Sequence, residues 1–375
     1  MTSRAAPGSP LRAADGVSRA GDDAWMARAL ELAHAGWGKV SPNPLVGAVV
    51  VRDGRIVGEG AHREFGGAHA EVEALNGAGE NARGADLFVT LEPCTHYGKT
   101  PPCVDAIIAA GIARVVVAVR DPNPEAGGGV ERLRAAGIRV DVGVLVDAAS
   151  ELNAAFLNSF RLDRPWVTLK LAISLDAAIA NASGTTSWLT GPPARQRVHH
   201  VRAGNDAIAV GMGTVLADDP LLTVRDAVPP RVRPTRVVFS RHGRLPLTSR
   251  LAQGTHEAPV IVFAAASDPS YDHALRELGV EVLTSASLRE SLQALRQRGI
   301  QSLLVEGGAS LTSAILEEDL VDRVILFQAP ILLGQGSLPA FAGMSIGATK
   351  DFRFRLLCSE WVGDDHMMVL APKGH

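Results

Sequence analysis

The sequence predicts a protein of two α/β domains, and three observations support that fold class. The chain has 375 residues, 46% of them hydrophobic, which is enough for two separate cores. Segments with helical and strand periodicity alternate along most of its length, as in mostly parallel sheets covered by helices. A charged stretch at 155–165, ending in proline, interrupts this alternation. We therefore predict a tail over 1–21, one domain over 22–160 and a second over 161–375.

The tail is expected to be disordered, because residues 1–21 are small, polar and turn-forming. They contain no apolar core of the kind that a secretory signal peptide needs. Their arginines and serines leave an organelle transit peptide as the alternative.

The first domain opens with a predicted helix at 23–37, where apolar residues recur at helical spacing and two glycines follow. Residues 45–60 predict two strands joined by a tight turn at Asp53-Gly54. The elements expected next are a helix from about 69, a strand at 86–91, a helix from 102, a strand at 114–119, a helix at 128–137 and a strand at 139–145.

The second domain begins with a predicted strand at 166–173. Further strands are expected at 234–240, 258–264, 280–284, 302–307 and 322–334. After the strand at 302–307, two glycines lead into a helix whose first turn carries Ser310 and Thr312. Such a turn exposes backbone N–H groups that can bind an anion, and ordinary helix capping is the alternative.

Charge and composition exclude several function classes. The net charge is −3 and the sequence pI about 6.4, which gives no electrostatic signature of binding to nucleic acid or an anionic membrane. The longest apolar run, around 107–119, is interrupted by Arg114 and is too short for a membrane span. Three cysteines cannot form a disulfide framework in a chain of this size, which favours a reducing compartment. We predict a soluble cytoplasmic protein.

Two of the cysteines and one histidine form a predicted metal site. Cys94 follows the strand at 86–91, Cys103 begins a helix behind two prolines, and His69 begins another helix. Imidazole nitrogen and thiolate sulfur are typical ligands of tetrahedral zinc, and a helix N-terminus favours the thiolate. Three ligands leave a fourth position for water, as in catalytic zinc sites. The alternative is an unrelated pair of buried cysteines beside a helix-capping histidine.

Glu71 is the predicted proton carrier. It lies two residues after His69, about 200° around an ideal helix, and therefore does not share the ligand face. His-x-Glu followed by Pro-Cys and a second cysteine is the signature of zinc deaminases. In the short form of that signature the cysteines lie close together, whereas eight residues separate Cys94 from Cys103 here.

Other polar residues have two interpretations from the sequence. Lys99, one of only five lysines, lies between the cysteines and could bind an anionic group or be an ordinary solvated side chain. Asn43 lies between two prolines, where its amide could contact a pyrimidine edge or simply form a turn. His62, which follows a predicted strand, and His96, which lies between the cysteines, could each contact substrate or be an ordinary exposed histidine. Lys170 lies inside a mainly apolar strand, where a lysine can be functional, paired with another group, or on a surface face.

Four stretches resemble the deaminase half of the bifunctional riboflavin-biosynthesis deaminase/reductases: SPNPLVGAVV, HAEVEAL, TLEPCTHYGKTPPC and DPNP. The long segment between the cysteines is that family's form of the site. The resemblance implies a cytidine-deaminase-like α/β/α sandwich that removes an amino group from a diaminopyrimidine ribosylamino phosphate by hydrolysis. It implies that His69, Cys94 and Cys103 bind zinc, that Glu71 shuttles protons, and that Asn43, His62, His96 and Lys99 contact substrate.

Four later stretches resemble the reductase half of the same family: KLAISLDAAIA, TTSWLT, RAGNDAIAVGMGTVLADDPLLTVR and LLVEGGASLTSAIL. The resemblance implies a dihydrofolate-reductase-like α/β domain in which NADPH reduces the ribosyl chain to ribityl. It places Lys170, Thr186, Arg202, Leu222, Arg225 and Glu306 at the substrate. It places Ala172, Trp188, Thr214, Asp218, Ser240, Gly308, Ala309, Ser310, Leu311, Thr312, Ser313 and Ala314 near NADPH.

The reductase half also departs from the family pattern. The family usually has Ser-Leu-Asp-Gly followed by Arg or Lys, whereas this chain has Ala177-Ala178 after Ser174-Leu175-Asp176. If that glycine has a positive φ, alanine is strained there. The departure leaves one alternative open, an active zinc deaminase joined to a reductase-like domain that only binds ligand.

A second alternative is a non-catalytic binding module in which zinc only stabilises the fold. The partner that we predict is a small phosphorylated molecule, with neither nucleic acid nor membrane, and with a homo-oligomer left open.

Overall fold

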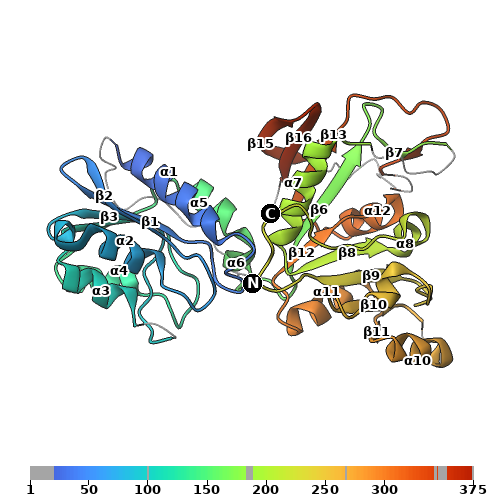
Figure 1. Cartoon of the computed structure of the whole chain (residues 1–375), viewed down its shortest axis with the longest axis horizontal. Coiled ribbons are helices and arrows are strands. Elements are labelled where there is room, and N and C mark those ends of the chain that lie inside the picture. The colour runs from blue at the N-terminus through green and yellow to red at the C-terminus, as the bar shows by residue number, and fades with distance from the viewer. Residues whose placement is uncertain are drawn as a thin grey trace, which may run out of the picture. The chain divides into compact units, whose positions relative to one another are not determined.

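A computed structural model describes residues 21–98, 101–182, 189–266, 268–341, 344 and 353–373. It divides into two compact units between Phe160 and Arg161, and each unit is a sheet with flanking helices (Figure 1). Each helix in the described ranges is too short or too polar to span a lipid bilayer.

Some predictions fall outside the described residues. The tail predicted over 1–21 does so apart from Gly21. Lys99, Thr186 and Trp188 do so as well.

The first unit is a mixed sheet between two layers of helices. Its strands are β1 (Gly47–Arg52), β2 (Arg55–Ala61), β3 (Asp86–Leu91), β4 (Arg114–Val119) and β5 (Arg139–Val142). Its helices are α1 (Asp22–Ala33), α2 (Ala70–Ala78), α3 (Cys103–Ala110), α4 (Gly129–Ala135), α5 (Val146–Leu152) and α6 (Ala154–Asn158), with 3-10 turns at His34–Gly36 and Gly79–Ala82. The strand order is β2-β1-β3-β4-β5, with β1 antiparallel to both neighbours and β3, β4 and β5 parallel.

Alternating side chains of the central strands supply both cores, because successive residues of a strand point to opposite faces. Val89 and Val117 belong to the core under α2, α3 and α4. Phe88 and Val116 belong to the core under α1 and α5. Figure 1 shows these two helical layers on opposite faces of the sheet. Because buried side chains alternate between the two faces of the sheet, helices pack on both faces and the unit is an α/β/α sandwich.

Two details of this unit differ from the sequence prediction. The sheet is mixed rather than mostly parallel, because the predicted hairpin turn, with positive φ at Asp53 and Gly54, reverses the chain between β1 and β2. The last strand ends at Val142 instead of 145, because Gly143 and Leu145 have φ of 107° and 51°. That backbone cannot continue a strand, and α5 begins directly afterwards.

A buried guanidinium joins the amino ends of the parallel strands. Arg114, at the start of β4, is only 2% exposed. It donates to Asp22 of α1 at 2.7 and 2.9 Å, to Asp86 at the start of β3 at 3.3 Å, and to Asp141 of β5 at 2.6 Å. These contacts hold one helix and three strands in a fixed register at the edge of the sheet opposite their carboxyl ends.

The second unit has a longer, mostly parallel sheet. Its strands are β6 (Trp166–Ile173), β7 (Ala178–Ala180), β8 (Ala207–Gly211), β9 (Thr235–Ser240), β10 (Val260–Ala264), β11 (Val280–Thr284), β12 (Ser302–Val305), β13 (Arg323–Gln328), β14 (Leu338–Pro339), β15 (Phe354–Val362) and β16 (Asp365–Pro372). Its helices are α7 (Pro192–Ala203), α8 (Met212–Asp218), α9 (Arg250–Gln253), α10 (Pro269–Glu277), α11 (Leu288–Gln297) and α12 (Ala309–Glu317). The main sheet has the order β11-β10-β9-β8-β12-β6-β13-β16-β15, parallel from β11 to β13 and antiparallel beyond, while β7 pairs with β14.

Helices cover both faces of this sheet. The core containing Leu169 and Phe239 packs under α11 and α12. The core containing Val238 and Val262 packs under α8, α9 and α10. α7 packs on the part of the sheet that includes Phe327 of β13.

The end of this unit was not predicted from the sequence. The strand expected at 322–334 ends at Gln328, and the hairpin of β15 and β16 was missed. Most residues of β15 are exposed because it forms the edge of the sheet, so its apolar pattern is weak.

Candidate functional site

The three predicted metal ligands meet at the carboxyl edge of the first sheet. Cys94 lies in the loop after β3, His69 precedes α2 as its N-cap residue, and Cys103 is the first residue of α3. His69 Nδ1 lies 3.1 Å from Cys103 Sγ and 3.5 Å from Cys94 Sγ. All three ligand atoms lie within 4.8 Å of one another.

This donor set fits zinc. In a tetrahedral zinc site, bond lengths of about 2.0 Å to nitrogen and 2.3 Å to sulfur place those atoms roughly 3.5 Å apart. The two nitrogen–sulfur distances of 3.1 and 3.5 Å are close to that value. Cys94 and Cys103 are buried and form no disulfide, so both sulfurs are available to a metal.

The protein environment favours thiolate at this site. Hydrogen bonding to Cys103 and then to His69 lowers the pKa of Cys94 to about 4. The same contact with Cys94, together with burial, raises the pKa of Cys103. The pair therefore favours one thiolate, at Cys94, and a bound cation would favour loss of the proton from Cys103 as well.

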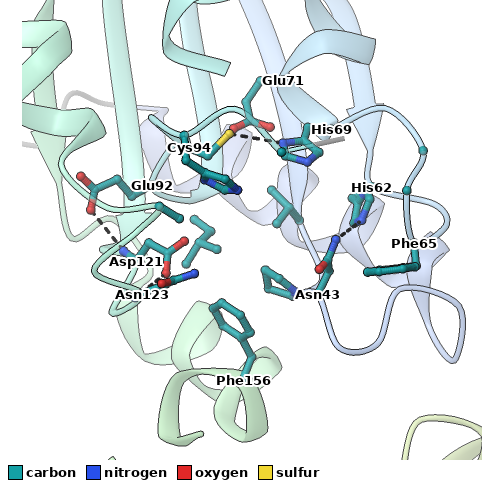
Figure 2. Close-up of a pocket in the computed structure, with 18 residues that line it drawn as sticks. Asn43, His62, Phe65, His69, Glu71, Glu92, Cys94, Asp121, Asn123 and Phe156 are labelled. Carbon is teal, nitrogen blue, oxygen red and sulfur yellow. Dashed lines mark hydrogen bonds between the residues drawn. The ribbon is translucent and has the colours of Figure 1, made fainter. Parts of the chain in front are cut away.

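Glu71 is buried beside the three ligands and points toward them from α2 (Figure 2). Burial raises its pKa to about 7, although the charge of His69 acts in the opposite direction. A carboxyl group with such a pKa can both accept and donate a proton near neutral pH.

A pocket opens in front of Glu71. Its lining includes the predicted residues Asn43, His62, His69, Glu71, Cys94 and His96. Cys103 is not among the lining residues; it contacts His69 and is fully buried. The remaining lining residues are Pro44, Val46, Phe65, Gly66, Gly67, Leu91, Glu92, Gly98, Asp121, Asn123, Ala126 and Phe156. Figure 2 shows Asn43 and His62 on one side of the pocket and Asp121 and Asn123 on the other.

Hydrogen bonds fix the amide orientation of Asn43. His62 Nδ1 lies 3.0 Å from the carbonyl oxygen of Ala68, which can only accept, so Nδ1 carries the proton. Burial lowers the pKa of His62, which keeps the ring neutral and makes Nε2 an acceptor. Asn43 Nδ2 therefore donates to Nε2 at 3.2 Å, and Asn43 Oδ1 remains an acceptor for a ligand N–H group.

Sequence reasoning gave no role to Glu92, Asp121 and Asn123. Glu92 accepts from the backbone N–H groups of Val130 at 2.9 Å and Asp121 at 3.1 Å, which ties the loop after β4 to the loop after β3. Burial raises the pKa of Asp121 to about 6. The signal that could have found Asp121 and Asn123 is their place directly after a predicted parallel strand, at the same edge as Cys94.

A second charged cluster lies in the other unit. Arg202 of α7 donates to both carboxylate oxygens of Glu306, at 2.5 and 2.9 Å. Burial would raise the pKa of Glu306, but Arg202, followed by Lys170, holds it at about 2. Burial lowers the pKa of Lys170, whose Nζ lies 5.9 Å from the centre of the Phe327 ring. Arg202 is therefore paired with a carboxylate, while Leu222 and Arg225 lie on the loop after α8.

The predicted NADPH residues lie mainly at the carboxyl edge of the second sheet. Thr214 in α8 follows β8, Ser240 ends β9, and Gly308 precedes α12 after β12. A Cβ atom at Gly308 would lie 3.2 Å from Thr214 Oγ1, so these two segments are adjacent. No side chain caps the N-terminus of α12 among the described residues, which leaves its backbone N–H groups for a ligand. Ala172 lies on β6, and Asp218 ends α8, the helix that carries Thr214.

Both halves of the chain match known domain families. Residues 20–119 match the cytidine and deoxycytidylate deaminase zinc-binding region, and residues 165–368 match the RibD C-terminal domain. The riboflavin biosynthesis protein RibD of Aquifex aeolicus is 46% identical over 84% of this chain and 88% of that protein. The RibD protein of Bacillus amyloliquefaciens is 43% identical over 94% of this chain and 96% of its own length.

The chain belongs to the RibD family.

Solved RibD structures have the same fold. The RibD structure from Acinetobacter baumannii is 42% identical, with a TM-score of 0.81 over 94% of this chain and 99% of that one. The Thermotoga maritima diaminohydroxyphosphoribosylaminopyrimidine deaminase/5-amino-6-(5-phosphoribosylamino)uracil reductase is 40% identical, with a TM-score of 0.82 over 94% of this chain and 98% of that one. The expected pair of a cytidine-deaminase-like domain and a RibD reductase domain is confirmed, and zinc and NADPH are its cofactors.

The departure from the RibD pattern lies at a left-handed residue. Ala177 has a φ of 59°, a conformation that glycine adopts more easily. Ser174 Oγ donates to Asp176 at 2.6 Å and accepts from Ala178 N at 3.0 Å. Asp176 also accepts from the N–H groups of Leu333 and Gly334 at 3.1 and 2.8 Å. The surrounding hydrogen bonds therefore hold the turn in place with alanine in it.

We expect Ala177→Gly to stabilise the second unit by about 1 kcal/mol, because the strain of a left-handed alanine is relieved. Urea denaturation followed by circular dichroism measures the change. Ala178→Gly is the matched control: Ala178 is buried in β7 without a positive φ, so glycine there should be destabilising. Equal effects at both positions would contradict this interpretation.

We expect Cys94→Ser or Cys103→Ser to reduce bound zinc at least about tenfold at a fixed free zinc concentration, because a hydroxyl replaces a thiolate ligand. Atomic emission on the purified protein gives the zinc content per chain. Cys358→Ser should leave it unchanged, since Cys358 is exposed on β15 in the other unit. Full zinc content in the Cys94 variant would rule out this ligand set.

Proposed function

We propose that this chain acts twice on one substrate of riboflavin biosynthesis. The first domain would remove an amino group from the diaminopyrimidine ribosylamino phosphate, and the second would reduce the ribosyl chain to ribityl. The observation that carries the proposal is Glu71, buried beside a zinc-type donor set at the end of an open pocket. The relatives' names and the Thermotoga maritima title support both reactions.

In the first reaction, His69, Cys94 and Cys103 would hold zinc. When bound, zinc supplies the Lewis acidity that makes water a nucleophile near neutral pH. Glu71 accepts the proton of the attacking water and later donates it to the departing amino group, so that ammonia leaves as a neutral molecule. Its pKa of about 7 suits both directions of transfer.

The rest of the pocket would position the substrate. Asn43 Oδ1, oriented through His62, would accept a hydrogen bond from an N–H group of the pyrimidine. Asp121 and Asn123 on the opposite side offer oxygen atoms to sugar hydroxyls. His96 and Lys99 would contact the remaining polar part of the substrate.

In the second reaction, NADPH supplies the hydride when bound. The residues that would hold NADPH are Ala172, Trp188, Thr214, Asp218, Ser240, Gly308, Ala309, Ser310, Leu311, Thr312, Ser313 and Ala314. Lys170 is the polar group that would face the sugar. The negative charge of Glu306 lies nearby and favours the protonated form of Lys170. Glu306 and Arg202 would orient the substrate as a pair. Arg225 would contact the phosphate. Thr186 and Leu222 would meet the substrate as well, Leu222 through its backbone because its side chain is buried.

Nothing in the matched domains or relatives favours the alternative of an impaired reductase domain. The proposed partner is a small phosphorylated molecule. The proposed compartment is the cytoplasm, because a reducing environment keeps the zinc-ligand thiols free.

We expect the purified, zinc-loaded protein to release ammonia from the diaminopyrimidine ribosylamino phosphate with or without NADPH. Loss of nicotinamide absorbance should follow only after deamination, because the second reaction uses the product of the first. Ammonia release without any NADPH oxidation would instead support the impaired-reductase alternative.

We expect Glu71→Gln to slow ammonia release by about 10² to 10⁴-fold, because an amide cannot carry the proton. Bound zinc and NADPH oxidation with the deaminated intermediate should remain. Glu80→Gln is the control, since Glu80 is exposed in the 3-10 turn after α2. A Glu71→Gln variant with full deaminase activity would refute this mechanism.

A further inference from the structure

The loop from Asp219 to Asp226 in the second unit has an unusual backbone. Asp219, Leu222 and Asp226 have φ of 39°, 50° and 52°, values that non-glycine residues rarely adopt. Leu222 is also buried, only 3% exposed. Each such residue persists only where the surrounding structure enforces it. The contacts that hold this loop are therefore of functional interest.

Those contacts come mainly from one face of α7. Arg202 Nη1 donates to the carbonyl oxygen of Thr223 at 2.9 Å. His199 Nδ1 accepts from the backbone N–H of Arg225 at 3.1 Å. Gln196 Nε2 donates to the carbonyl oxygen of Asp226 at 3.4 Å. Gln196, His199 and Arg202 are spaced three residues apart, so their side chains lie along the same side of the helix.

The loop has few other polar attachments. From Pro220 to Asp226, no backbone–backbone hydrogen bond joins it to another segment that the structure describes. At its start, Asp219 N donates to the carbonyl oxygen of Val215, and Asp219 Oδ1 accepts from the N–H of Arg250 at 2.8 Å. The row of side chains on α7 therefore sets the shape of the second half of the loop.

Among the described residues, His199 is the member of this row whose hydrogen bonds go to the loop alone, with the charges of Arg202 and Glu306 nearby. Arg202 also binds Glu306, and Gln196 makes a longer hydrogen bond. Burial, followed by the charges of Arg202 and Arg225, lowers the pKa of His199. The ring is then neutral near pH 7, and Nδ1 can accept the Arg225 N–H.

We propose that His199 is a positioning residue for the reductase reaction: it holds the Asp219–Asp226 loop in the strained shape that presents the backbone of Leu222 and the side chain of Arg225 to the substrate. This inference rests on the proposed function, which places those two residues at the substrate. It adds a residue of α7 that does not touch the substrate itself.

The test compares His199→Ala with His199→Asn. Alanine removes the acceptor, whereas asparagine places Oδ1 near the former position of Nδ1 and can accept the same N–H. We expect His199→Ala to raise the KM of the deaminated substrate about tenfold with little change in kcat, the size of effect expected from one lost hydrogen bond. His199→Asn should restore the KM to within about twofold.

Two further measurements separate positioning from general damage. Hydrogen exchange of the Arg225 amide should speed up in His199→Ala but not in His199→Asn. Ammonia release, which depends on the other unit, should not change in either variant. His273→Ala is the matched control, because His273 is an exposed histidine of α10 paired with Glu277.

Direct binding of ribose 5-phosphate by calorimetry keeps this inference distinct from the proposed function. If the unaltered protein does not oxidise NADPH with the deaminated substrate, the proposed function fails, while weaker binding of ribose 5-phosphate by His199→Ala than by the unaltered protein would still support the inference. An unchanged KM and affinity in His199→Ala, or equal losses in the alanine and asparagine variants, would overturn it.

Discussion

Parallel strand pairing is the constraint on which both sites depend. In a parallel sheet all carboxyl ends meet at one edge, and the loops that follow them converge there. In the first unit this edge brings together Cys94 after β3 and Asp121 after β4. In the second unit it aligns Ser240 after β9 with Gly308 after β12. The helices that start at these edges add backbone N–H groups and ligand residues such as Cys103.

Two glutamates, one buried and one partly buried, show how the same side chain is adapted to different tasks. Among the described residues no Arg or Lys side chain is bonded to Glu71, and burial, with a smaller effect from the charge of Cys94, raises its pKa into the range where a proton can be exchanged. Glu306 is less completely buried, with 12% of its side chain exposed, and its two hydrogen bonds to Arg202 keep it ionised. The first environment suits proton transfer and the second suits a fixed charge that orients neighbouring groups.

The sequence predicted the parts that depend on local pattern. His69, Glu71, Cys94 and Cys103 were found because zinc chemistry restricts residue type and spacing. The acceptor orientation of Asn43 could not be predicted, since it follows from the contact of His62 with the carbonyl oxygen of Ala68. The edge strand β15 was missed because exposure on both faces removes its alternating pattern. Contacts between distant segments, such as the row on α7, leave no signal in a single sequence.

The Arg114 cluster has a consequence for how the first unit is made. Its partners Asp22, Asp86 and Asp141 are spread over most of that unit, and the pair with Asp22 spans 92 positions of the chain. A growing chain that ends before Asp141 would bury a guanidinium without its full set of carboxylates. The unit therefore completes its folding only when nearly all of it has left the ribosome, and shorter fragments should be poor folding units.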